Sequence, residues 1–111
     1  MQNEVHDETS LEMGRRVAGR LREQPVLLQI ARDNLARWLR QNADASALVH
    51  CYREWQAILE LPLGDICHIL EIDSEESRRL RQNSPFAGVL HPAEVWSIKA
   101  AIRQRHAKTA A

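Results

Sequence analysis

The 111-residue chain contains few of the residues on which several protein classes depend. Its two cysteines are too few for the disulfide framework of a small secreted domain. It has four glycines and four prolines, whereas an all-β fold needs many tight turns. No apolar run reaches membrane-spanning length, and the N-terminus lacks the basic and apolar regions of a secretory signal. We therefore expect a helical, cytoplasmic protein that does not associate with a membrane.

The length and composition indicate one domain. The apolar fraction of 44% and the charged fraction of 27% are typical of a globular protein. We predict an all-α fold, a compact single-domain bundle of five or six helices within residues 11–108. Residues 1–10 are polar and aperiodic, so we predict a flexible N-terminus there.

Apolar residues recur at steps of three and four, which is the helical period. Gly14 and Gly19 weaken the first predicted helix, which therefore needs packing against a partner to persist. Asp44 and Asp73 are predicted N-caps. The helices are predicted over residues 11–23, 25–42, 45–61, 63–71, 74–82 and 92–108. Their predicted core residues are Leu11, Gly14, Val17, Leu21, Leu28, Ala31, Leu35, Trp38, Leu39, Leu48, Val49, Tyr52, Trp55, Ile58, Leu59, Ile66, Ile69, Leu70, Leu80, Val95, Ile98 and Ile102.

The net charge is zero, but the charges are segregated. Residues 41–76 hold eight acids and one base, whereas residues 77–111 hold seven bases and one acid. One interpretation is that the blocks form ion pairs within the molecule, since exposed pairs are common and weak. The other is a basic face for an acidic partner. Thirteen of the fifteen bases are arginine, which suits bidentate contacts to anions.

Neither a metal site nor a catalytic set is expected. His50-Cys51 and Cys67-His68 offer zinc ligands, but neighbouring residues on a helix point about 100° apart and cannot easily face one ion. Nothing in the sequence indicates a Cys–His nucleophile pair with an orienting group, and no phosphate-binding glycine loop occurs. We predict a protein that is not an enzyme and has no cofactor. The three tryptophans lie on three predicted helices and are expected to be core anchors.

The segment Ser74–Leu90 is the candidate binding site. It starts as an arginine-rich helix, breaks at a Ser-Pro pair and carries the only phenylalanine. An apolar tip beside basic side chains can enter a pocket of a partner. In the alternative interpretation, Phe86 folds back onto the chain's own core, as a lone phenylalanine usually does. The predicted partner-binding residues are Arg78, Arg79, Arg81, Gln82, Asn83, Ser84, Pro85 and Phe86.

The run Leu61–Leu80 resembles the helix-turn-helix unit of bacterial sigma-type and regulator DNA-binding domains. The resemblance implies that Arg78, Arg79 and Arg81 approach DNA. Two residues depart from the pattern. Glu71 stands where the turn usually has a glycine, and Ser77 stands at a core position of the second helix that is usually Val or Ile. The carboxylates that open the second helix would repel phosphates. The resemblance also implies core roles. Ile66 and Leu70 would be core residues of the first helix, and Cys67 would be the small residue at the helix crossing. Ile72 would be the apolar turn residue, and Leu80 would anchor the second helix.

A second resemblance covers about the C-terminal half of the chain. Asp73–Leu90, together with Trp55-Gln56-Ala57-Ile58-Leu59, resembles segments of small helical proteins from bacterial toxin–antitoxin operons. It implies a non-catalytic antitoxin that binds and neutralises a toxin encoded by a neighbouring gene. This is our leading hypothesis. A helix-turn-helix regulator of its own operon, binding DNA, is the alternative, and the Leu11–Glu23 helix is a candidate homodimer contact.

Overall fold

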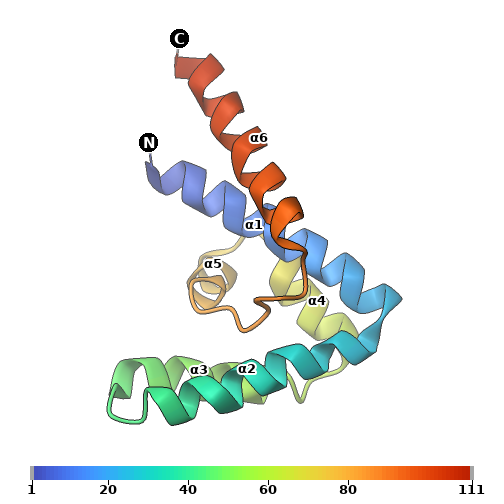
Figure 1. Cartoon of the computed structure of the whole chain (residues 1–111), viewed down its shortest axis with the longest axis vertical. Coiled ribbons are helices and arrows are strands. Elements are labelled where there is room, and N and C mark those ends of the chain that lie inside the picture. The colour runs from blue at the N-terminus through green and yellow to red at the C-terminus, as the bar shows by residue number, and fades with distance from the viewer. Residues whose placement is uncertain (1, 111) are drawn as a thin grey trace.

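Six α-helices and one short 3₁₀ helix form the part of the chain that the structure, a computed structural model, describes: residues 2–110 (Figure 1). No strand occurs within those residues, so the predicted all-α fold is confirmed. No helix in this part of the chain has the length and apolarity of a membrane span. In chain order the elements are α1 (Gln2–Glu23), η1 (Pro25–Leu27), α2 (Leu28–Gln41), α3 (Ser46–Ile58), α4 (Leu63–Glu71), α5 (Glu75–Arg81) and α6 (Pro92–Ala110).

The other helices are arranged around α1, against which α4 and α6 both pack. Two ion pairs mark the antiparallel register of α1 and α6: Arg20 pairs with Glu94 at 2.9 Å, and Glu8 pairs with Arg105 at 3.0 Å. α2 and α3 form a helical hairpin, which lies below the other helices in Figure 1. The chain between α5 and α6 runs through the space between α1 and this hairpin (Figure 1).

A glycine allows α1 and α4 to approach closely. A Cβ atom at Gly14 would lie 2.2 Å from the backbone carbonyl oxygen of Leu70, so a larger residue would force the helices apart. A Cβ atom at Gly19 would meet no atom within 4 Å. The two glycines weaken the helix alike, but only Gly14 is required by the packing.

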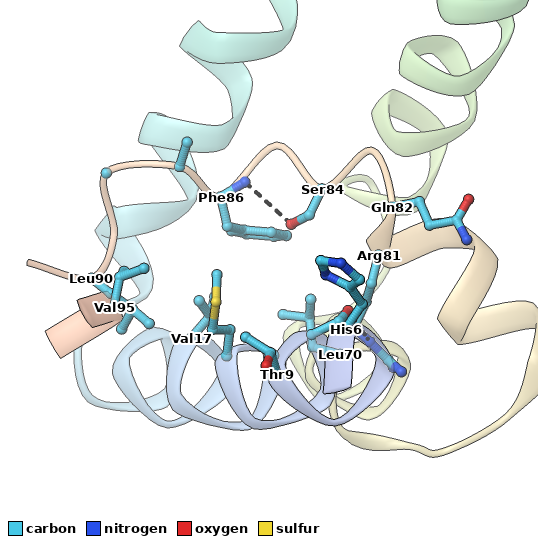
Figure 2. A pocket seen from close by; sticks show the side chains of 15 residues that line it. His6, Thr9, Val17, Leu70, Arg81, Gln82, Ser84, Phe86, Leu90 and Val95 are labelled. Carbon is cyan, nitrogen blue, oxygen red and sulfur yellow. Dashed lines mark hydrogen bonds between the residues drawn. The ribbon is translucent and has the colours of Figure 1, made fainter. Parts of the chain in front are cut away.

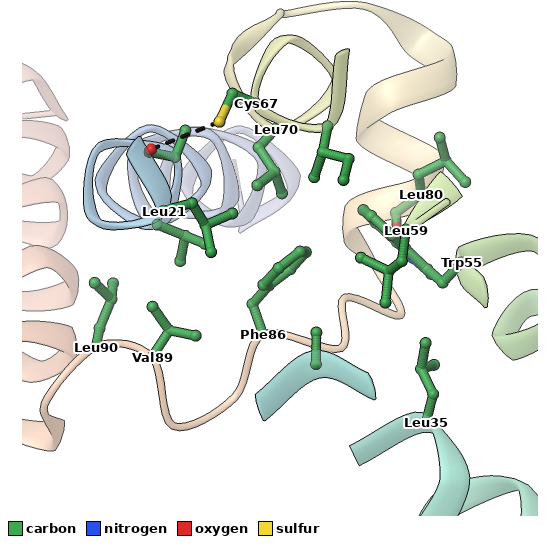
Figure 3. Close-up of a cluster of buried hydrophobic side chains, with 14 of the residues drawn as sticks. Leu21, Leu35, Trp55, Leu59, Cys67, Leu70, Leu80, Phe86, Val89 and Leu90 are labelled. Atoms are coloured by element: carbon green, nitrogen blue, oxygen red, sulfur yellow. Dashed lines mark hydrogen bonds between the residues drawn. The ribbon is translucent and has the colours of Figure 1, made fainter. Parts of the chain in front are cut away.

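One hydrophobic core joins α1, the hairpin, α4 and the segment after α5 (Figure 3). Trp55 of α3 lies inside it with 1% of its surface exposed. Phe86 meets the Trp55 ring edge-on, with the ring centroids 5.7 Å apart, a preferred geometry for aromatic pairs. Most predicted core residues are buried, so the helical period located the core correctly. The predicted residues that the structure buries are Leu11, Gly14, Val17, Leu21, Ala31, Leu35, Tyr52, Trp55, Leu59, Ile66, Leu70, Leu80, Ile98 and Ile102.

The start of the first helix differs from the prediction. The sequence places residues 1–10 outside the helical domain, but α1 already spans them from Gln2. Polar residues in this stretch contact segments that are distant in the sequence. Glu8 pairs with the C-terminal part of α6, and Ser10 accepts a hydrogen bond from Arg81. A local search for apolar periodicity cannot detect such contacts.

Two helices begin one residue later than predicted. The N-cap of α3 is Ala45 rather than Asp44. The N-cap of α5 is Ser74, whose hydroxyl accepts a hydrogen bond from the Ser77 backbone N–H at 3.1 Å. Asp73, the predicted cap, instead accepts a hydrogen bond from Arg78. Its carboxylate therefore serves an ion pair.

Candidate functional site

Arg79 lies between two carboxylates of its own chain. Its guanidinium donates to both carboxylate oxygens of Glu54 on α3, at 3.0 and 2.6 Å, and also to Glu76. These hydrogen bonds raise the pKa of Arg79 and lower the pKa of Glu54. The bidentate geometry is the strong form of an Arg–carboxylate contact. Arg79 thus links α5 to α3.

Arg78 is also paired within the molecule. It donates to Asp73 at 3.0 Å, and its Nε lies 3.6 Å from a carboxylate oxygen of Asp7 on α1. The hydrogen bond to Asp73 and the charge of Asp7 raise the pKa of Arg78. Its side chain is about one-third exposed, so the ion pairs lie at the surface. Arg78 therefore ties the start of α1 to α5.

Arg81 is buried, with 6% of its surface exposed. Its Nε donates to the Ser10 hydroxyl at 3.0 Å, and its Nη1 donates to the Ile72 carbonyl at 2.9 Å. Burial lowers its pKa, because the charged form loses hydration. Its Nη2 is buried and has no hydrogen-bond partner.

The predicted apolar tip is part of the core. Pro85 and Phe86 are buried, so the interpretation in which Phe86 folds back onto its own core is the correct one. Asn83 and Ser84 are half-buried, and Gln82 is exposed. The interpretation in which an apolar tip enters a pocket of a partner beside unpaired arginines is therefore wrong, because Arg78 and Arg79 are ion-paired and Arg81 is buried. The charge blocks do form ion pairs within the molecule.

Asn34 of α2 holds this segment in place, and no sequence signal pointed to it. Its Nδ2 donates to the backbone carbonyls of Pro85 and Ala87, at 2.8 and 2.9 Å. Asn34 is only 6% exposed. Gly88 follows with a φ of +98°, a conformation that favours glycine. A polar residue on the apolar face of a predicted helix is the only hint that could have identified Asn34.

The α4–α5 pair has the element order of a helix-turn-helix unit. Its exposed surface does not favour DNA, because Glu75 and Glu76 lie exposed in the first turn of α5 while Arg79 is paired with carboxylates. Ile72, the expected apolar turn residue, is 37% exposed, and α5 is only seven residues long. The core residues implied by the resemblance are buried: Ile66, Cys67, Leu70 and Leu80.

A pocket of about 350 Å³ lies between the first half of α1 and the segment after α5 (Figure 2). Figure 2 shows Phe86 above it and Val17 and Leu70 on the opposite side. His6 and Arg81 lie toward one end, and Leu90 and Val95 toward the other. The pocket therefore has a polar end and an apolar end.

Trp96 of α6 differs from the other two tryptophans. It is 69% exposed, whereas Trp55 is buried and Trp38 is half-buried, so the prediction of three core anchors is wrong for Trp96. The guanidinium carbon of Arg103 lies 6.0 Å from its ring centroid, within cation–π range. Sequence periodicity placed Trp96 beside the inward stripe, but α6 has few neighbours on its outer side.

In the described residues, no three His, Cys, Asp or Glu side chains gather closely enough to hold a metal ion. Cys67 is buried against the Ala18 carbonyl, and burial raises the pKa of its thiol. No family model, no curated protein and no solved structure matches this chain.

Proposed function

We propose that this chain is a non-catalytic, antitoxin-like protein that binds an acidic surface of a partner protein through the outer face of α6. The observation that carries this proposal is the exposure of Trp96 with Arg103 over its ring. Tryptophan and arginine are the residue types most enriched among interface hot spots. An exposed tryptophan on a rigid helix loses little conformational freedom when it binds.

The charge of α6 supports an acidic partner. After Glu94 in its first turn, the helix carries four bases and no acid. Lys99 and Arg103 lie one and two turns beyond Trp96, and all three are exposed. A basic face accelerates encounter with an acidic surface and favours it over a basic one. This surface replaces the segment Arg78–Phe86, whose arginines and phenylalanine are used within the fold.

The alternative, a DNA-binding regulator, has less support. The α5 arginines are paired with carboxylates and Glu75 and Glu76 precede them. The homodimer contact through Leu11–Glu23 also has less support, since the apolar side chains of that stretch pack inside the chain. Both are kept as outcomes of the experiment below.

The test is co-expression with the product of the neighbouring gene, followed by size-exclusion chromatography and a growth-rescue assay. The wild-type chain should co-elute with the partner and restore growth. Trp96→Ala and Arg103→Glu should each weaken the complex by tenfold or more while leaving the helical circular dichroism unchanged. Val26→Ala is the matched control, because Val26 is 75% exposed but lies far from α6 in the sequence.

Three results would reject the proposal. The first is no complex with the neighbouring product. The second is a complex that neither substitution weakens. The third is salt-sensitive binding to operator DNA without a protein complex, which would favour the regulator instead. A homodimer that dissociates on Trp96→Ala would assign α6 to self-association.

A further inference from the structure

The pocket between α1 and the segment after α5 has a divided lining. Its apolar end is formed by side chains that are half-buried or buried, and its polar end by hydroxyl, amide, imidazole and guanidinium groups (Figure 2). A volume of about 350 Å³ falls within the range of small-molecule sites, about 300–1,000 Å³. The apolar lining includes Met13, Val17, Leu70, Phe86, Leu90 and Val95.

The polar end holds a buried cation without a carboxylate. In the described part of the chain, no acidic side chain lies within ion-pair distance of Arg81, whose two hydrogen bonds go to neutral oxygens of Ser10 and Ile72. Its Nη2 has no partner at all. A buried charge normally has a counter-charge, because the loss of hydration is otherwise uncompensated.

The nearby acids are already engaged by another arginine. Asp7 and Asp73 both pair with Arg78, which borders the adjoining cavity together with Arg81. Asp7 and Asp73 therefore both contact Arg78, and neither contacts Arg81. His6 and Gln82 also border the polar end, and each can donate a hydrogen bond. Arg81 is therefore the guanidinium that no carboxylate of the described residues contacts.

We propose that this pocket binds a small monocarboxylate with an apolar tail, the carboxylate contacting Arg81 and the tail lying against Phe86 and Val95. The carboxylate would accept a charge-assisted hydrogen bond from Nη2, the guanidinium nitrogen of Arg81 that has no partner. The Ser10 hydroxyl accepts from Arg81 and so keeps its own proton to donate. Because Nη2 is buried, the proposed contact requires a side chain at the border of the pocket to move, and the exposed His6 is the candidate.

The geometry favours a carboxylate over a phosphate. The site offers one unpartnered guanidinium nitrogen, and Asp7 borders the adjoining cavity, where a dianion would be repelled. The elongated apolar lining adds binding energy for a tail but none for a bare ion. The expected ligand is therefore amphipathic, with one negative charge.

Octanoate is the probe, with octan-1-ol and acetate as matched compounds that lack the charge or the tail. Titration is followed by calorimetry and by intrinsic tryptophan fluorescence, to which Trp55 contributes; the Trp55 ring contacts Phe86. Octanoate should bind at least about tenfold more tightly than either matched compound, the effect of one charge-assisted hydrogen bond. Equal affinity for octanoate and octan-1-ol, or no binding of octanoate, would overturn the proposal.

Two substitutions locate the binding. Arg81→Met should remove the preference for octanoate over octan-1-ol. Val95→Phe should weaken both compounds, because it fills the apolar end and leaves Arg81 unchanged. If Arg81→Met does not fold, the titrations of the native protein and of Val95→Phe still test the proposal. Octanoate binding that is unchanged by Val95→Phe would place the ligand elsewhere and reject the site. None of these measurements uses the partner protein of α6.

Discussion

The indole nitrogen of Trp55 donates a 2.9 Å hydrogen bond to the backbone carbonyl of Leu80, and this bond ties the last turn of α3 to the end of α5. The same indole packs edge-on against Phe86. One side chain thus contacts both the helix that carries the arginines and the segment that follows it. The Trp55 ring is buried in the core, and its only polar atom, the indole nitrogen, is hydrogen-bonded.

Trp55 should therefore contribute more by packing than by its hydrogen bond. Trp55→Ala is expected to lower the free energy of unfolding by about 3–5 kcal/mol, because it leaves a large cavity. Trp55→Phe keeps much of the volume and loses the donor, so we expect a smaller loss, about 1–2 kcal/mol. Urea denaturation followed by circular dichroism measures both. Equal losses would contradict the larger role of packing.

Asn34 should be needed for the conformation of the segment after α5. In Asn34→Asp the side chain keeps its size but can no longer donate to the carbonyls of Pro85 and Ala87. We expect a loss of at least about 2 kcal/mol in the free energy of unfolding and faster amide exchange in residues 82–91. Gln41→Glu makes the same change at an exposed site of α2. It should have little effect.

The two glycines of α1 should respond oppositely to alanine. Gly14→Ala places a methyl group against the Leu70 carbonyl and should destabilise the protein strongly, by more than about 2 kcal/mol. Gly19→Ala enters open space and should raise the free energy of unfolding by about 0.5–1 kcal/mol through helix propensity. Thermal and urea denaturation distinguish the two. Similar effects at both sites would contradict the close helix approach.

The Arg79–Glu54 ion pair should make stability depend on acidic pH. Arg79 lowers the folded-state pKa of Glu54 below its ordinary value. A carboxyl with a lowered folded-state pKa stabilises the fold above its unfolded pKa, about 4.3, and this contribution is lost as the pH falls through the folded value. The free energy of unfolding should therefore decrease below about pH 5.

Glu54→Gln should make that decrease shallower, which denaturation at several pH values would measure. Glu60→Gln is the control, because it makes the same change at an exposed carboxylate in the turn after α3. If the two variants have the same pH profile as the wild type, the ion pair does not contribute to stability.

Arg79→Glu should be destabilising at neutral pH rather than tolerated as an exposed charge change. The substitution would bring three carboxylates together, since Glu54 and Glu76 both contact Arg79. Repulsion among them should decrease as the pH falls and the carboxyls take up protons, or as salt is added. Arg53→Glu, an exposed change on α3, should lack this recovery at low pH.

Much of the fold follows from local patterns in the sequence. Apolar residues three and four positions apart can share one side only in a helix, so the helices and most core positions were predictable. Pro92 is the first residue of α6, a position where its lack of a backbone N–H costs no helical hydrogen bond. The small number of glycines and prolines excluded a fold with many turns. These properties depend on neighbours within a few residues.

The state of each charged or aromatic side chain depended on tertiary contacts. Arg79 meets Glu54 and Arg81 meets Ser10 across 25 and 71 positions, and no local pattern encodes such pairs. The exposure of Trp96 likewise depends on which helices lie beside α6. Periodicity identifies a helix and its apolar side, whereas burial and ion pairing are set by the elements that the fold places opposite it.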